Sequence, residues 1–303
     1  MDRGAASVVT VVDMRWQDER LTALDVDEVF GVFEAARLAD GREGAGGLPS
    51  FLTGPGPHLV ATESGRTVGY LHLDTAGDSF GNQVAELVVH PAARQRGLGS
   101  AMVRALLDRV GDAKLRVWAH GDHPGAAALA ASHGFERVRE LLRMRWEVGQ
   151  LPEPVWRPGV TVRTFVPGAD EAAVIEVNRR AFSWHPEQGA LTVADLERTE
   201  AEPWFDPAGF FLAVDAEDRV LGFHWTKVHR EREPLGEVYV VGVDPDAQGG
   251  GLGKALTLVG LHHLREAGLR RVMLYVESDN TPAVAVYTKL GFGLWDADVQ
   301  YAR

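Results

Sequence analysis

The stretch YVVGVDPDAQGGGLGK, residues 239–254, decides the fold. A hydrophobic run leads into a proline, a polar loop and a group of glycines. Four apolar residues between 252 and 259 then recur at i, i+3, i+4 and i+7, which is the spacing of one helical face. The run VMLYVE at 272–277 alternates as a strand does. Strand, glycine loop, helix and strand in this order predict a parallel strand pair with a right-handed crossover, and hence an α/β fold.

The same unit occurs earlier in the chain. AELVVHPAARQRGLGS at 85–100 has the same order of features, with identical spacing from the proline to the last glycine. Each half also ends its unit with Gly-Phe, at Gly134-Phe135 and Gly291-Phe292. The copies are about 155 residues apart, far more than the period of about 20 to 50 residues in solenoids. The sequence therefore predicts a domain duplication.

A proline-rich segment separates the two copies. GQLPEPVWRPG at 149–159 holds three prolines, which forbid a helix and disfavour a central strand. We therefore predict an N-terminal domain at 1–148, a linker at 149–159 and a C-terminal domain at 160–303. A length of 303 residues fits two domains.

Composition excludes several classes of protein. A net charge of -12 argues against a nucleic-acid partner, which clustered Lys and Arg would have to hold. The absence of cysteine excludes disulfides, a thiolate nucleophile and zinc–thiolate sites. No stretch reaches the roughly 18 apolar residues of a membrane span, and residues 1–10 lack a signal-peptide pattern, so we expect a cytoplasmic protein with no membrane partner. His262 and His263 point to different helix faces, and no metal site is predicted.

The glycines of the hexapeptide at 248–253 allow backbone N–H groups to approach a ligand closely. Free N–H groups at a helix N-terminus, together with the helix dipole, stabilise an anion such as a phosphate. The alternative is a glycine-rich turn that binds nothing. The hexapeptide matches neither the Walker A motif nor G-x-G-x-x-G.

Residues 248–253 and 94–99 instead resemble the Q/R-x-x-G-x-G/A signature of the GNAT acyltransferase superfamily. The resemblance implies two tandem GNAT domains, each a mixed central sheet flanked by helices, with acetyl-CoA as co-substrate. Residues 236–257 and 274–292, with HPEQG at 185–189 and HWTKVH at 224–229, resemble the mycothiol synthase family within it. That family implies a small-molecule amine acceptor, desacetylmycothiol, acetylated in the last step of mycothiol biosynthesis. It also suggests a monomer.

In this superfamily the CoA diphosphate binds to the glycine loop, and the preceding strand binds the pantetheine. The resemblance assigns cofactor binding in the C-terminal domain to Val241, Gly242, Val243, Gln248, Gly249, Gly250, Gly251, Leu252, Gly253, Lys254, Asn280, Thr281, Pro282, Ala283, Val284 and Ala285. In the N-terminal domain it assigns cofactor binding to Leu87, Val88, Val89, Gln95, Arg96, Gly97, Leu98, Gly99 and Ser100.

Acetyl transfer from CoA to an amine needs a base for the amine proton and an acid for the departing thiolate. The resemblance implies that Glu237 is the base, acting directly or through water, and that Tyr287 is the acid. Without the motif, Glu237 would be a solvated carboxylate at a strand end and Tyr287 a core residue. In the first domain Ala130 stands at the place of Tyr287 and His123 at that of Asn280. We therefore predict that this domain does not catalyse, although Glu86 remains a possible base there.

The resemblance also implies contacts to the acceptor from Glu187, Lys227, Glu237 and Tyr275, with Glu43 as a nearby candidate in the first domain. Glu187 and Lys227 have a plain alternative as exposed loop and strand residues. Two other functions stay open: a GNAT enzyme acting on another small-molecule or peptide amine, and a non-catalytic acyl-CoA-binding module.

Overall fold

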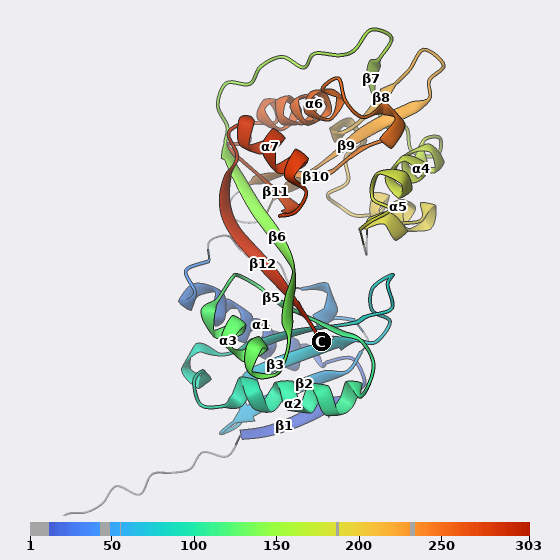
Figure 1. The fold of residues 1–303 in the computed structure, drawn as a ribbon. Coiled ribbons are helices and arrows are strands. Elements are labelled where there is room, and N and C mark those ends of the chain that lie inside the picture. The colour runs from blue at the N-terminus through green and yellow to red at the C-terminus, as the bar shows by residue number, and fades with distance from the viewer. Residues whose placement is uncertain (1–11, 43–48, 55, 186–187, 231–233) are drawn as a thin grey trace, which may run out of the picture. The chain divides into compact units, whose positions relative to one another are not determined.

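The computed structural model describes residues 12–42, 49–54, 56–185, 188–230 and 234–303. Glu43 and Glu187 lie outside these residues. The chain divides into two units: unit 1 comprises Met1–Arg139 with Asp298–Arg303, and unit 2 comprises Glu140–Ala297 (Figure 1). None of the described helices is long and apolar enough to cross a membrane.

Unit 1 is a mixed sheet in the order β1-β2-β3-β4-β5, followed by the end of β12. Among the strands that the structure describes in unit 1, β4 and β5 form the one parallel pair, and α2 connects them. The elements are β1 (Val12–Gln17), α1 (Ala23–Ala39), η1 (Ser50–Leu52), β2 (His58–Glu63), β3 (Arg66–Asp74), β4 (Gln83–Val89), η2 (Pro91–Ala93), α2 (Leu98–Val110), β5 (Leu115–Ala119) and α3 (Pro124–Ser132).

Unit 2 repeats this plan, with the sheet order β7-β8-β9-β10-β11-β6. Again only one pair, β10 and β11, is parallel, and α6 connects its strands as the sequence predicted. The elements are β6 (Glu136–Glu147), β7 (Thr161–Thr164), α4 (Glu171–Ala181), η3 (Gln188–Ala190), α5 (Val193–Glu200), η4 (Pro207–Gly209), β8 (Phe210–Val214), β9 (Val220–His229), β10 (Leu235–Val243), η5 (Pro245–Ala247), α6 (Leu252–Glu266), β11 (Arg271–Glu277), α7 (Thr281–Lys289) and β12 (Gly293–Ala302).

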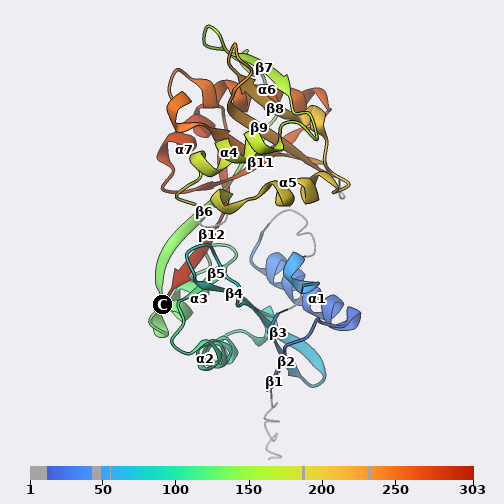
Figure 2. The same cartoon turned by 90° about the vertical axis from the view of Figure 1, so that its right-hand side faces the viewer.

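Helices cover both faces of each sheet because strand residues alternate between faces. In unit 1, Leu71 packs with α2 and its neighbour Tyr70 with α1, on the opposite side (Figure 2). In unit 2, Leu258 and Leu261 of α6 pack against β11, whereas α4 and α5 pack on β8 and β9 on the other side (Figure 1). Each sheet is therefore the middle layer of three, as an α/β fold requires.

Part of β6 belongs to unit 2 and part of β12 belongs to unit 1, which the sequence repeat did not suggest. Residues 141–147 of β6 pair antiparallel with β11 of unit 2. The end of β12, from Val299 to Ala302, pairs with β5 of unit 1. The structural division thus falls at 139/140 and 297/298, whereas the repeat places the linker at 149–159. That segment contains no helix or strand, as its prolines predicted, but it belongs to unit 2.

Candidate functional site

The parallel strands of unit 2 pair over only part of their length. The β10–β11 ladder joins Gly236 to Val238 with Val272 to Leu274 and ends there. A register shift in the pairing with β9 follows between Val238 and Val240. Beyond it, residues 240–243 stay paired to β9 but have no ladder partner on the β11 side. The backbone groups of Val241, Gly242 and Val243 on that side therefore have no strand partner.

The glycine loop lies directly after this open end. Gly249, Gly250 and Gly251 all have left-handed φ values, of 87°, 59° and 81°. Gly251 is the N-cap of α6, and no side chain caps the helix. The N–H groups of Gly253 and Lys254 in the first turn therefore have no partner within the helix and are available to an anion, whereas the N–H of Leu252 donates to the carbonyl oxygen of Gly249 at 3.5 Å. Thus the loop has the conformation that its glycines predicted.

Unit 1 has a related open end. Its β4–β5 ladder stops at Glu86 and Trp118, so Leu87, Val88 and Val89 lie beyond it. Gln95 takes a left-handed φ of 59°, and Gly97 caps α2 with a φ of 83°. Gln95 corresponds to Gly249 in the repeat and Gly97 to Gly251. Both pairs therefore have the same left-handed conformation.

Glu237 is a buried carboxylate one residue before the end of the β10–β11 ladder. It is 5% exposed, and its Oε2 lies 2.7 Å from Nε2 of His229 in a hydrogen bond. Because its carboxylate is buried, Glu237 is not the solvated strand-end residue of the alternative interpretation. His229 was not identified from the sequence, because its link to Glu237 arises from the pairing of β9 with β10.

Lys227 lies directly opposite Glu237 in the β9–β10 pairing. Its ammonium stands 4.2 Å from the ring centre of Trp204 and 5.2 Å from that of Tyr239. Trp225 contacts both rings, with centroid distances of 5.6 Å and 5.2 Å. Lys227 is therefore a half-buried cation held on aromatic faces.

Tyr275 lies on the same face of the sheet. Met273 is the register partner of Glu237, and Tyr275 follows it by two residues on β11, which returns it to that face. Its ring is 42% exposed, and the Arg143 guanidinium lies 5.6 Å from its centre. The structure thus brings Glu237, Lys227 and Tyr275 together on one face.

Tyr287 occupies α7 on the opposite side of this sheet. It belongs to the core cluster that includes Val238, whose side chain faces away from that of its neighbour Glu237. Burial raises the pKa of the Tyr287 phenol to about 12, so it is protonated at neutral pH. Asn280 caps this helix by accepting a hydrogen bond from the Ala283 N–H at 3.3 Å. Glu237 and Tyr287 therefore lie on opposite faces of the unit 2 sheet.

The corresponding helix of unit 1, α3, carries no tyrosine. Ala130 packs against the core there, and His123 caps the helix by accepting a hydrogen bond from the Gly125 N–H at 2.9 Å. The cap is preserved, but the phenol is absent. Nothing in α3 replaces the acid predicted for unit 2.

Unit 1 nevertheless holds an ionic cluster at the end of its ladder. Glu86 Oε2 lies 2.7 Å from Nε2 of His120, and Nδ1 of the same ring lies 3.6 Å from Asp298. Arg42 donates to Asp298 at 2.8 Å. Burial alone lowers the pKa of His120, but Asp298 and Glu86 outweigh it and raise that pKa to about 10. Burial alone raises the pKa of Asp298, but His120 and Arg42 lower it to about 2.

Two family models match the chain. The model described as "Acetyltransferase (GNAT) family" covers residues 173–292, and the model described as "Acetyltransferase (GNAT) domain" covers residues 54–137. The predicted α/β fold with two tandem GNAT domains, each a mixed sheet flanked by helices, is confirmed by these matches and by the two sheets described above.

Solved structures share the fold over the whole chain. A GCN5-related N-acetyltransferase from Sphaerobacter thermophilus has a TM-score of 0.75 at 24% identity, covering 96% of this chain and 95% of that one. A tandem GNAT protein from the clavulanic acid biosynthesis pathway has a TM-score of 0.68 at 22% identity, covering 96% of this chain and 98% of that one.

Curated relatives are much closer in sequence. "Mycothiol acetyltransferase" of Amycolatopsis mediterranei is 55% identical, with 96% of this chain and 99% of the relative covered. The protein of the same name from Actinosynnema mirum is 55% identical, with 96% and 100% covered. That from Nocardia farcinica is 51% identical, with 96% and 98% covered. The chain therefore belongs to the mycothiol acetyltransferase family of tandem GNAT N-acetyltransferases.

Proposed function

We propose that unit 2 transfers the acetyl group of acetyl-CoA to the cysteinyl amine of desacetylmycothiol, the conjugate of cysteine, glucosamine and inositol. The observation that carries this proposal is the buried Glu237, which lies where the parallel ladder opens and shares its face with Lys227 and Tyr275. The likeness to the mycothiol acetyltransferases supports the choice of acceptor.

The residues of unit 2 fit acetyl-CoA, which supplies an acetyl group already activated as a thioester. The N–H groups from Gly249 to Lys254, except that of Leu252, which donates to the carbonyl oxygen of Gly249, would hold the diphosphate. The unpaired edge of residues 241–243 would hold the pantetheine. The cap of α7, at Asn280, Thr281 and Pro282, and the turn after it at 283–285 would border the same chain.

Glu237 would take a proton from the acceptor ammonium, directly or through water, and leave a neutral amine. That amine forms the new C–N bond to the acetyl carbon as the C–S bond breaks. The leaving thiolate would take the proton of the Tyr287 phenol, which lies on the opposite face of the sheet from Glu237. The acylated nitrogen would lose its second amine proton to solvent, and the Tyr287 phenolate would regain a proton from solvent. His229 holds the Glu237 carboxylate in place through their 2.7 Å hydrogen bond, and is therefore a positioning residue.

The acceptor has many hydroxyls and requires polar contacts. Lys227 and Tyr275 would provide them beside Glu237, with Glu187 and Glu43 as the further predicted contacts outside the described residues. Unit 1 keeps the open ladder and the loop at 94–100 but lacks a tyrosine on α3. We infer that it binds CoA without transferring an acetyl group, which leaves one catalytic site per chain.

Mass-spectrometric analysis of the product tests this proposal. Purified protein with acetyl-CoA is offered desacetylmycothiol, a polyamine and a peptide N-terminus in separate reactions. We expect an N-acetylated cysteinyl product with desacetylmycothiol at a kcat/KM at least about a hundred-fold above that of the other amines. Equal rates with all three amines would refute the acceptor, and no acetylated product at all would refute the reaction.

A further inference from the structure

Arg157 lies against the glycine loop of unit 2, although the cofactor signature does not include it. It stands in the extended segment at 149–159. A Cβ atom added at Gly250 would lie 2.6 Å from the Arg157 Cδ and 3.7 Å from its Nε. The Arg157 side chain therefore covers the place that a side chain at the centre of the loop would occupy.

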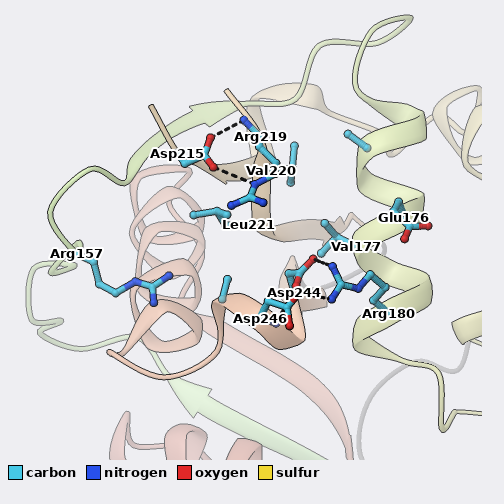
Figure 3. Close-up of a pocket in the computed structure, with 12 residues that line it drawn as sticks. Arg157, Glu176, Val177, Arg180, Asp215, Arg219, Val220, Leu221, Asp244 and Asp246 are labelled. Carbon is cyan, nitrogen blue, oxygen red and sulfur yellow. Dashed lines mark hydrogen bonds and ion pairs between the residues drawn. The ribbon is translucent and has the colours of Figure 1, made fainter. Parts of the chain in front are cut away.

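Arg157 also lines a cavity of about 360 Å³ together with Arg180 and Arg219 (Figure 3). Arg180 donates to Asp244 and Asp246, each at 2.7 Å, and Arg219 donates to Asp215 at 3.0 Å. In Figure 3 no dashed line reaches Arg157. Among the residues that the structure describes, its guanidinium has no carboxylate partner.

The internal repeat gives this arginine a counterpart. When the two halves are aligned on Pro91 and Pro245, Gly250 corresponds to Arg96. The loop of unit 1 thus carries its own guanidinium, which bonds to Glu63 at 2.8 Å. The loop of unit 2 has glycine at that position, and Arg157 from outside the repeat brings a guanidinium there. The position that Arg96 occupies in the unit 1 loop is thus a glycine in unit 2, and the Arg157 side chain lies against that glycine.

The charges around the unit 2 loop explain the need for this cation. Asp244 and Asp246 lie just before the loop and would repel a diphosphate. Arg180 forms ion pairs with both carboxylates, so its positive charge is already neutralised. Arg157 adds a positive charge that remains available, in a chain whose net charge is -12.

We propose that Arg157 binds the diphosphate of CoA and so adds a charged contact to the backbone N–H groups of residues 249–254. The inference rests on the proposed function, because it requires CoA at this loop. A guanidinium matches phosphate oxygens with two parallel N–H donors, which an ammonium cannot do. The contact is remote from the reacting atoms, so it stabilises the bound ground state and the transition state equally.

Steady-state kinetics of Arg157→Gln with three acetyl donors tests the inference. We expect the KM for acetyl-CoA to rise about ten-fold with kcat unchanged, because a half-buried charge-assisted contact of this kind is lost. Arg157→Lys should recover part of the loss. The matched control is Arg270→Gln, an exposed arginine of unit 2 at the turn before β11, which should leave KM unchanged.

The donors identify the group that is bound. Acetyl-dephospho-CoA keeps the diphosphate but lacks the 3′-phosphate, so the ten-fold difference should persist with it. Acetyl-pantetheine has neither group, so wild type and Arg157→Gln should then behave alike. An unchanged KM for acetyl-CoA in Arg157→Gln, or a difference that disappears with acetyl-dephospho-CoA, would overturn the assignment.

Calorimetric titration of the wild-type protein with CoA separates this inference from the proposed function. Absence of CoA binding to the wild type would refute the proposed function itself. Binding by the wild type with an unchanged KM in Arg157→Gln would refute only the role of Arg157.

Discussion

Two glutamates, Glu237 in unit 2 and Glu86 in unit 1, bear on the proposal that one unit catalyses. Glu86 is the last residue of the β4–β5 ladder and Glu237 is the last but one of the β10–β11 ladder, and each bonds to a histidine at 2.7 Å. They differ in their surroundings, because only Glu237 has a tyrosine on the helix that follows the next strand. Similar carboxylate–histidine pairs therefore need not have similar roles.

We expect Glu237→Gln to lower kcat by about 10² to 10³, because the amide cannot accept the amine proton. Glu86→Gln should leave kcat within about two-fold of the wild type, since no acid faces it across the unit 1 ladder. Both are measured by CoA release under saturating acetyl-CoA, with CoA affinity as the control for folding. A larger loss of kcat in Glu86→Gln than in Glu237→Gln would place catalysis in unit 1 and contradict the proposal.

Only some residues of the candidate site could be predicted from the sequence. Glu237 and Tyr287 were predicted as site residues because both lie in stretches of sequence that resemble a known family. His229 and Trp204 were missed because their neighbours at the site are brought there by strand pairing and ring packing, not by spacing in the chain. Arg157 was missed for a similar reason, since its contact with Gly250 links a proline-rich segment to a distant loop.

Helix α6 requires a glycine at its centre because of a buried histidine. His224 of β9 is fully enclosed, and its Nδ1 lies 2.7 Å from the carbonyl oxygen of Leu256. A Cβ atom at Gly260 would stand 2.1 Å from the His224 Cε1. Helix α6 can therefore pack this closely on β9 only because residue 260 has no side chain.

We expect Gly260→Ala to lower the free energy of unfolding by about 1 to 3 kcal/mol, because the added methyl overpacks the interface. Gly31→Ala is the matched control. Gly31 is also helical, has nothing within 4 Å of its added Cβ, and should gain about 0.5 to 1 kcal/mol from helix propensity. Urea unfolding of both variants checks this, and equal stability of the two would contradict the packing shown for α6.

The order of elements around each glycine loop was predictable because the signals are local. The spacing of apolar residues after Gly251 predicted the helix α6, and the alternation at 272–277 predicted the strand β11. The partner of β6 was not predictable. Met144 and Trp146 alternate as in any strand, and nothing in their own sequence specifies that they pack with Val272 and Leu274. The repeat consequently assigned β6 wholly to the N-terminal domain, whereas its residues from Glu140 onward lie in unit 2.

The ionic cluster of unit 1 makes the stability of the whole chain depend on pH. His120 has a pKa of about 10, raised above its ordinary 6.5 by Asp298 and Glu86. Its contribution is therefore complete below pH 6.5 and is lost as the pH rises through 10. Asp298 has a pKa of about 2, lowered from 3.8, so its contribution is present above pH 3.8 and is lost as the pH falls through 2.

We expect the unfolding midpoint of the wild type to exceed that of His120→Gln most at pH 5 to 6.5, and the difference to shrink toward pH 10. Thermal unfolding at a series of pH values measures this, and NMR titration of the His120 ring gives its midpoint directly. A His120 midpoint near the ordinary value of 6.5 would show that the cluster does not hold the proton in solution.

The whole molecule uses one fold twice with different outcomes. Both units keep the open parallel ladder and the left-handed loop residues that suit CoA, but only unit 2 adds a tyrosine opposite its carboxylate. The duplication was legible in the sequence because the two loops keep the same spacing. The pairing of β6 with β11 and of β12 with β5 could not be predicted from the sequence, because these strands are far apart in the chain.

A crystal structure with CoA and desacetylmycothiol bound tests the central claim most directly. The account predicts a CoA diphosphate on the N–H groups of residues 249–254, its sulfur at the open end of the ladder between Glu237 and Tyr287, and the acceptor amine within hydrogen-bond reach of Glu237 or of a water bound to it. A unit 2 loop without CoA in that crystal, or an acceptor amine away from Glu237, would contradict it.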